Sequence, residues 1–239
     1  MQFLHLEVIV KPLEAVRAEF AARTVRLAGE SIDTRGRFTM AIPGGSLLTA
    51  LLPALIDADI DWQRTDVFWV DERGVPPDHP DSNYGTARDG WLQEPTRRGA
   101  RVFPMPGGAD DLAAGAAAYA ATLRDTLGSR PVLDLAVLGV GPDGHVASLF
   151  PGGAALDERE QPVAAVTDAP KAPARRLTLT LPVLARSRTT CVAIFGTEKR
   201  DVVGCLLEDA ACEMPVARLL GQVSTAWLLL DAGSAGRAG

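Results

Sequence analysis

Residues 133–145, LDLAVLGVGPDGH, decide the fold of this chain. The run from 133 to 139 is mostly apolar, which is typical of a strand buried on both faces of a sheet. A glycine-rich turn ends this run. A second strand of the same kind, TDVFWV at residues 65–70, comes earlier in the chain. Such strands predict a parallel sheet with helices covering both faces.

Outward from this stretch, strands alternate with helical segments. We expect further strands at 4–10, 37–42, 176–181, 190–195 and 225–230. Helices are expected after Pro12 and over 47–56, 110–128 and 198–207. Pro53 should interrupt the helix over 47–56. This alternation predicts a doubly wound, mostly parallel, Rossmann-like α/β sheet. Because no composition break divides the chain, we expect one domain at 1–231 and a flexible tail at 232–239.

The composition excludes several classes of protein. The chain has 239 residues and a formal net charge of -6, and its basic residues form no stripe, so we expect no nucleic-acid partner. No apolar stretch is long enough for a membrane span, and the N-terminus does not resemble a signal peptide, so we expect a cytoplasmic protein. The three cysteines Cys191, Cys205 and Cys212 are too few for a disulfide framework or a zinc cluster. Cys191 is expected in the core.

Ligands of such sheets bind beyond the carboxyl ends of the strands, and three loops there carry polar groups. The first is Pro43-Gly44-Gly45-Ser46. Its glycines and the following helix N-terminus predict a phosphate site. Ser46 is either a phosphate ligand or the N-cap of an ordinary turn.

The second loop, Asp71-Glu72-Arg73, follows the strand TDVFWV directly. The arginine offers a planar fork for phosphate or carboxylate. The alternative is a solvated strand end with an Asp–Arg pair. Ser82-Asn83, at the end of this loop, is predicted to cap the next helix.

The third loop, from Gly139 to His145, formally contains GxGxxG. We reject a dinucleotide site because the motif lies in mid-chain, contains Pro142 and Asp143, and precedes no clear helix. His145 instead suits a general base, and Asp143 could orient its ring. The alternative is a surface histidine. His5 and His79 have no comparable surroundings.

Two more basic residues are candidates. Arg176 begins the strand RLTLTL, and Lys199 follows the glycine turn after CVAIFG. Lysine is rare here, with only Lys11, Lys171 and Lys199 in the whole chain, so Lys199 indicates a specific ammonium group. The alternative for both residues is a surface charge.

Together these segments resemble the 6-phosphogluconolactonase family along most of the chain. The matching pieces are PGGS at 43–46, WVDERGVPPDHPDSNYG at 69–85, LDLAVLGVGPDGHVASLFPG at 133–152, KAPARRLTLTLPVL at 171–184 and GTEKRDVV at 196–203. One departure is that Leu47-Leu48 follows Ser46, where the family usually has Thr-Pro, so a hydroxyl contact to phosphate is lost. The deaminase that shares this fold looks like DEY and DGHIAFNEP, whereas this chain has DER and DGHVASLFP.

The resemblance implies a glucosamine-6-phosphate deaminase-type fold and a carboxylic-ester hydrolase of the pentose phosphate pathway that converts 6-phosphogluconolactone to 6-phosphogluconate. It implies catalytic roles for His145, Asp143 and Arg73. Substrate and phosphate contacts are expected at Gly44, Gly45, Ser46, Asp71, Arg176, Lys199 and Gly144. Backbone N–H groups of the 141–144 loop, or a nearby arginine, are expected to stabilise the oxyanion.

The expected partner is a small sugar-phosphate substrate. No metal or organic cofactor is needed, since the ester is intrinsically reactive, and we expect a monomer or a weak homodimer. A deaminase or isomerase and a non-catalytic sugar-phosphate sensor are the alternatives.

Overall fold

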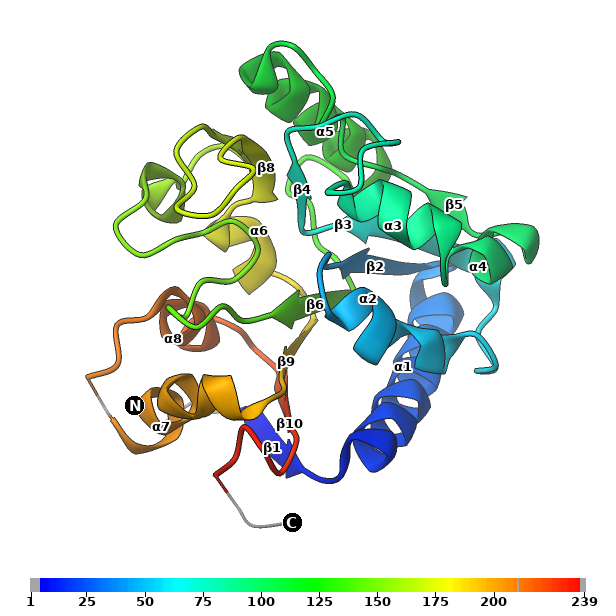
Figure 1. Cartoon of the computed structure of the whole chain (residues 1–239). Coiled ribbons are helices and arrows are strands. Elements are labelled where there is room, and N and C mark those ends of the chain that lie inside the picture. Colours follow the sequence, from blue (N-terminus) through cyan, green and yellow to red (C-terminus); the bar gives the residue numbers. More distant parts are fainter. Residues whose placement is uncertain (1–4, 210, 237–239) are drawn as a thin grey trace.

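Residues 5–209 and 211–236 are described by the computed structural model. Its main sheet is fully parallel, with the strand order β1-β10-β9-β6-β2-β3-β5 (Figure 1). The bounds are β1 Leu6–Val10, β10 Ala226–Leu230, β9 Thr189–Ile194, β6 Leu135–Gly139, β2 Phe38–Ile42, β3 Thr65–Trp69 and β5 Arg101–Val102. The mostly parallel α/β prediction is confirmed. Leu4, the predicted first residue of the first strand, lies outside the described residues.

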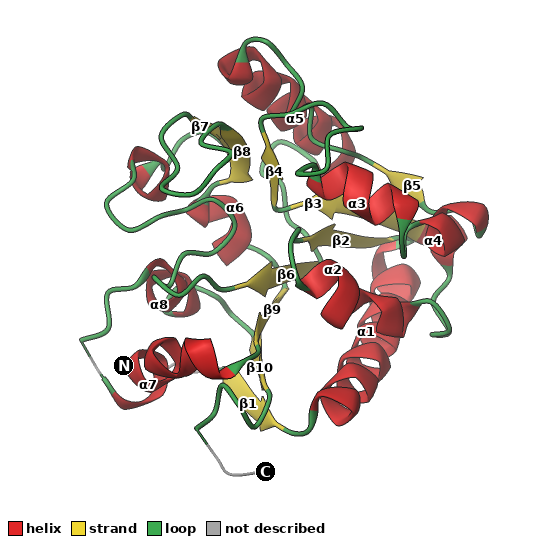
Figure 2. Cartoon of the chain, viewed as in Figure 1, coloured by secondary structure: helices red, strands yellow, loops and turns green. Residues whose placement is uncertain are grey.

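Helices lie on both faces of this sheet, as Figure 2 shows with α1 on one side and α6, α7 and α8 on the other. The α-helices are α1 Leu13–Arg35, α2 Leu47–Ala50, α3 Asn83–Asp89, α4 Gln93–Arg97, α5 Leu112–Leu127, α6 Leu181–Ala185, α7 Arg200–Glu208 and α8 Pro215–Leu220. The predicted interruption at Pro53 is present, because α2 ends at Ala50 and a 3-10 turn, Leu52–Leu55, follows. Proline lacks the N–H that would continue an α-helix.

The order of the strands places a switch point between β2 and β6. From β2 the chain moves outward through β3 to β5, and from β6 it moves the other way through β9 to β10. At such a point the two loops leave the sheet in opposite directions and open a crevice. The loops that begin there are the glycine turn at 43–46 and the loop that carries His145.

Three strands lie outside the main sheet. β4 (Asp71–Arg73), β8 (Arg176–Leu179) and β7 (Val163–Val166) form a separate antiparallel sheet. The strand predicted at 176–181 therefore ends at Leu179 and does not join the parallel sheet. β4 follows β3 after one residue, so the second sheet stands at the carboxyl end of the first and adds a wall there.

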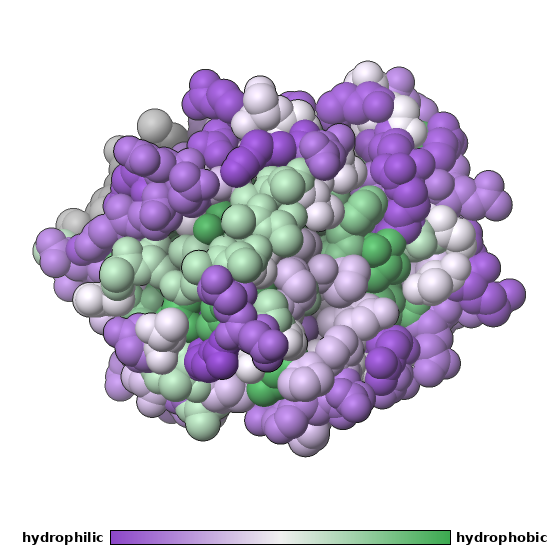
Figure 3. Space-filling model, turned by 90° about the horizontal axis from the view of Figure 1, so that it is seen from above, coloured by the Kyte–Doolittle hydropathy of each residue, from purple (hydrophilic) through white to green (hydrophobic). Residues whose placement is uncertain are grey.

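The helix α5 covers this second sheet through small side chains. Alanines of α5 and β7 border a shallow groove of about 350 Å³ between them. Seen from the α5 side of the molecule, apolar residues gather in an area rimmed by hydrophilic ones (Figure 3). The predicted inner face of α5, with Leu112, Tyr119 and Leu123, is buried.

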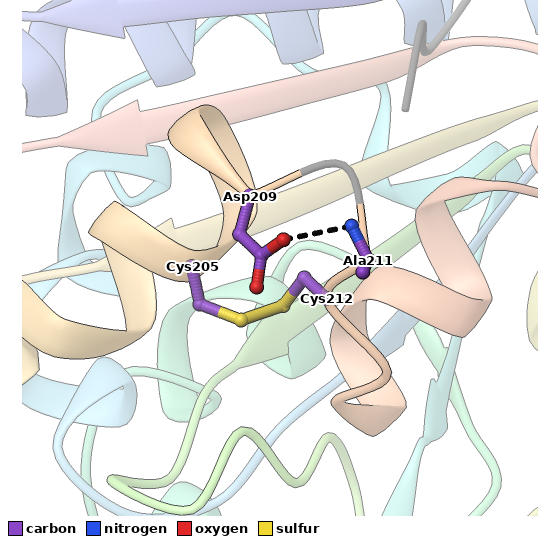
Figure 4. The surroundings of a disulfide bond; sticks show 4 residues. All are labelled: Cys205, Asp209, Ala211 and Cys212. Atoms are coloured by element: carbon purple, nitrogen blue, oxygen red, sulfur yellow. Dashed lines mark hydrogen bonds between the residues drawn. A yellow bond between two sulfur atoms is a disulfide. The ribbon is translucent and has the colours of Figure 1, made fainter.

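The cysteine prediction was partly wrong. Cys205, in α7, and Cys212, before α8, form a disulfide with a Cα–Cα distance of 5.5 Å (Figure 4). The Asp209 carboxylate accepts a hydrogen bond of 2.8 Å from the Ala211 N–H inside this loop. The pair joins residues that a helix end brings close, which a count of cysteines does not reveal. Cys191 is a buried free thiol, as predicted, and burial raises its pKa.

Residues after 231 still pack on the domain. The Ser234 side chain is buried and donates a 2.7 Å hydrogen bond to the Ile194 carbonyl. The packed domain therefore extends beyond the boundary expected at 231, and residues 237–239 of the expected tail lie outside the described residues. Within 5–209 and 211–236, no helix has the length and apolar character needed to cross a membrane.

Candidate active site

A cavity of about 390 Å³ opens at the carboxyl ends of the central strands. Loops after β2, β6 and β9 form its wall together with β4 and the segment before β8. Most of the predicted site residues line it, namely Gly44, Gly45, Ser46, Asp71, Arg73, His145, Arg176 and Lys199. Residues far apart in sequence thus meet at one site. Asp143 and Gly144, also predicted, do not line this cavity.

The turn after β2 presents backbone donors. Within the described part of the chain, the N–H groups of residues 44–47 donate to no protein acceptor. Gly44 must be glycine, because a Cβ there would collide with the Asn83 side chain, and Gly45 has a φ of 66°. The Ser46 side chain makes no N-cap bond to α2. Ser46 and these N–H groups remain available to an anion in the cavity.

The loop after β6 holds an oriented imidazole. His145 Nδ1 lies 2.5 Å from Asp143 Oδ1, and the side chain of His145 is only 17% exposed. Burial alone would raise the pKa of Asp143, but its hydrogen bond with His145 lowers it overall, so the carboxylate is ionised. An ionised carboxylate accepts, so Nδ1 is the protonated nitrogen of neutral His145 and Nε2 is left as the base.

Burial also sets the proton affinity of this ring. It lowers the pKa of His145 and outweighs the opposing effect of Asp143. The ring contacts Phe150, with ring centroids 4.5 Å apart, which excludes water from one face. His145 is therefore neutral near pH 7 and able to accept a proton.

The predicted role of the glycine loop in oxyanion binding is not supported at two of its amides. The Gly141 N–H donates to the His145 carbonyl at 2.9 Å, and the Gly144 N–H donates to the Gly141 carbonyl at 3.0 Å. Both donors are used by the turn itself. Gly144 has a φ of 77° and packs against Met214, so its contribution is to the shape of the loop. A Cβ on Gly141 would collide with the imidazole of His145.

The residues Asp71, Glu72 and Arg73 have three different functions in the structure. The Asp71 carboxylate is buried and accepts a 2.7 Å hydrogen bond from the Ser148 hydroxyl. Glu72 accepts hydrogen bonds from Ser82 Oγ and from the backbone N–H groups of residues 73, 83 and 84, although burial raises its pKa. Glu72 therefore anchors the start of α3 to β4.

Only part of the Arg73 guanidinium group has a hydrogen-bond partner among the described residues. Its Nη1 donates to the Asp81 carbonyl at 3.2 Å, whereas its buried Nε has no partner among the described residues. The alternative of an Asp71–Arg73 pair is wrong, since no such ion pair forms within the described chain. The predicted cap is confirmed, because Ser82 Oγ accepts from the Gly85 N–H at 3.0 Å.

Two further cations lie on the other walls. Arg176 is buried, and burial lowers its pKa. Its Nε and Nη2 donate to the carbonyls of Pro173 and Lys171, each at 3.0 Å, which leaves Nη1 for a ligand. Lys199 lies in a 3-10 turn after Gly196, and partial burial lowers its pKa.

The sequence analysis missed three lining residues with polar side chains, Asn83, Lys171 and Glu198. Asn83 was considered only as a helix cap, yet its Nδ2 donates to the Asp71 carbonyl at 2.9 Å. Lys171 is one of the three lysines of the chain. The scarcity argument used for Lys199 would have identified it. No comparable signal marks Glu198.

Other features offer less chemistry. A larger hollow of about 810 Å³ lies between α1 and α4. Its arginines Arg64 and Arg97 pair with Asp61 and Glu94, and Arg98 donates to two backbone carbonyls. No group of three or more His, Cys, Asp or Glu residues suited to a metal ion occurs in the described residues. The cavity beside His145 therefore combines the most reactive and charged side chains.

A doubly wound sheet with a cationic cavity and a buried imidazole at its switch point defines an α/β enzyme that acts on a small anionic substrate. The chain belongs to the family described as glucosamine-6-phosphate isomerases/6-phosphogluconolactonase, whose model matches residues 12–227.

Individual relatives agree with this assignment. The chain is 33% identical to a probable 6-phosphogluconolactonase 2 of Arabidopsis thaliana over 237 residues, which is 92% of this chain and 91% of the relative. A solved 6-phosphogluconolactonase of Trypanosoma cruzi is similar with a TM-score of 0.85 and 28% identity, over 99% of this chain and 97% of that one. A monomeric glucosamine-6-phosphate deaminase shares the fold, with a TM-score of 0.78, 22% identity and coverage of 98% and 99%.

Proposed function

We propose that this enzyme hydrolyses 6-phospho-D-glucono-1,5-lactone to 6-phospho-D-gluconate. The observation that carries the proposal is that a neutral imidazole, oriented by Asp143, shares one cavity with Arg73, Arg176 and Lys199. The similarity to named lactonases of plants and trypanosomes supports the same substrate. The cavity of about 390 Å³ suits a phosphorylated six-carbon sugar derivative.

The phosphate is held between the β2 loop, the β9 loop and the start of β8. Lys199 supplies an ammonium group, Arg176 its remaining Nη1, and residues 44–47 their unpaired N–H groups. These contacts are remote from the reacting carbon. Their binding energy aligns the lactone carbonyl with His145.

His145 Nε2 takes a proton from a water molecule as the water oxygen attacks C1 of the lactone. The carbonyl oxygen becomes an oxyanion, which Arg73 stabilises, and Asp143 stabilises the imidazolium. When the tetrahedral intermediate collapses, the bond between C1 and the ring oxygen breaks. His145 returns its proton to that oxygen, giving the acid and a free hydroxyl group.

The test is acid release from freshly made 6-phosphogluconolactone, with spontaneous hydrolysis subtracted and unphosphorylated gluconolactone as the comparison substrate. We expect strong acceleration with the phosphorylated lactone only. An enzyme that instead releases ammonia from glucosamine 6-phosphate would be a deaminase. Binding of 6-phosphogluconate without turnover would indicate a sugar-phosphate sensor.

A further inference from the structure

We propose that Lys171 is a further catalytic residue of this site, whose ammonium group stabilises the negative charge that develops on the lactone carbonyl oxygen. This inference rests on the proposed lactone hydrolysis. It concerns a residue on the loop before β8, which faces the cavity beside His145.

The loop that carries Lys171 is held in place by the fold. The Ala169 N–H donates to the Ala174 carbonyl at 3.0 Å and closes the loop. The Arg176 guanidinium binds the backbone of this loop, donating to the carbonyls of Lys171 and Pro173 at 3.0 Å each. A buried guanidinium needs acceptors, and these carbonyls supply them. The backbone of Lys171 is therefore fixed, although its side chain is exposed.

The same arginine ties this loop to the catalytic ring. The Arg176 guanidinium lies 5.5 Å from the centroid of the Phe150 ring, and the centroid of the same ring lies 4.5 Å from that of the His145 imidazole. Lys171 is thus placed relative to His145 through a stack of packed groups. Its positive charge acts on both His145 and Lys199, lowering the pKa of each.

The reaction end of the cavity has room for a second cation beside Arg73. The Gly141 and Gly144 amides are used within their own turn, so they cannot face an oxyanion. Asp71 places a carboxylate near the imidazole, which would oppose negative charge on the substrate. Lys171 forms no ion pair with any described carboxylate, so its ammonium group is free for the substrate. Charge stabilisation of this kind is commonly the largest contribution to acyl transfer.

The experiment uses Lys171→Met, Lys171→Arg and the matched surface control Lys11→Met, assayed with 6-phosphogluconolactone. Removing a single oxyanion donor typically costs about 10²–10³ in kcat. For this exposed lysine, which shares the charge with Arg73, we expect Lys171→Met to lose roughly 10- to 100-fold in kcat. KM for the phosphorylated lactone should change little. Lys171→Arg, which keeps the positive charge, should recover most of the loss.

A pH profile gives a second readout. The charged groups that act on His145 are Asp143 and Asp71, which favour its protonated form, and Lys171, which opposes it. Loss of Lys171 should therefore move the acidic limb of kcat/KM to higher pH, whereas Lys11→Met should leave it in place. If the wild-type enzyme is active, either of two results would overturn the role of Lys171. One is a Lys171→Met variant with an unchanged acidic limb. The other is a Lys171→Met variant whose only defect is a higher KM for the phosphorylated lactone. Inactive wild-type enzyme would overturn the proposed hydrolysis itself.

Discussion

The pairing of arginine and lysine side chains differs between the two ends of the main sheet. At the amino ends, Asp66 accepts hydrogen bonds from Arg37 and Arg101, and Asp134 accepts from Thr39 and Arg35 and pairs with Arg188. At the carboxyl ends, Arg73 Nε has no partner among the described residues, and Lys199 makes no ion pair there. A satisfied cluster stabilises the fold, whereas an unsatisfied one, held by the fold around it, is available to a ligand.

The backbone also differs between the two ends of the sheet, because a strained conformation occurs at the carboxyl end. Among the described non-glycine residues, only Ala147 has a positive φ, and it lies on the cavity wall two residues after His145. Such a conformation costs free energy and is found where function requires it. The comparison can be tested by removing groups from each end and measuring activity and stability separately.

The largest effect is expected from His145→Ala, because the variant has no general base. We predict a loss of about 10²–10⁴ in kcat with retained binding of 6-phosphogluconate, measured by steady-state kinetics and calorimetry. His5→Ala, which changes an exposed histidine, is the control. Near-full activity of the His145 variant would remove this residue from the mechanism.

Asp66→Asn should reduce the stability of the fold and leave kcat largely unchanged. The side chain is buried and accepts from two arginines, so the loss of its charge should lower the free energy of unfolding by about 3 kcal/mol, measured in urea. Asp89→Asn, at an exposed site, should leave the urea midpoint unchanged. A large fall in kcat without loss of stability would contradict the division between the two ends.

The pH dependence of stability checks the same cluster. Burial alone would raise the pKa of Asp66, but its hydrogen bonds with Arg101 and Arg37 lower it overall. A carboxyl group with a lowered pKa stabilises the fold at neutral pH, and this stabilisation is lost as pH falls through its folded pKa. The wild-type protein should therefore lose more stability on acidification than Asp66→Asn does.

Lys199→Ala should act on binding more than on chemistry. Loss of one charge-assisted contact to phosphate predicts a rise in KM of roughly 10- to 100-fold, with a smaller change in kcat. Lys11→Ala, which removes an exposed lysine paired with Glu19, is the matched control. An unchanged KM for the phosphorylated lactone would refute the phosphate role of Lys199.

The smallest effect is expected from the double variant Cys205→Ser, Cys212→Ser. The bond joins α7, which follows Lys199, to the segment before α8, and within α8 the Val216 N–H donates to the Gly144 carbonyl at 3.0 Å. Because the closed loop is short, we expect a loss of about 1–2 kcal/mol in the free energy of unfolding. Dithiothreitol should destabilise the wild-type protein equally and leave the double variant unaffected. Equal stability of all these forms would show that the disulfide contributes nothing.

Local sequence predicted much of this molecule. The apolar runs at 65–70 and 133–139 required a sheet covered on both faces, and the alternation of strands and helices made it parallel. Glycines after strands identified the turns at 44–45 and 141–144, since only glycine fits where Asn83 and His145 approach the backbone. The acid two residues before His145 also predicted the ring orientation, because that contact is local.

Contacts between distant segments were decided only by the tertiary structure. The sequence could not show that Ser148 reaches Asp71, that Arg176 fixes the loop of Lys171, or that Cys205 meets Cys212. It also suggested the Gly141 and Gly144 amides as donors, which the turn itself uses. Hydrophobic periodicity specifies which face of each element is buried, but the partner of a polar group depends on how those faces pack together.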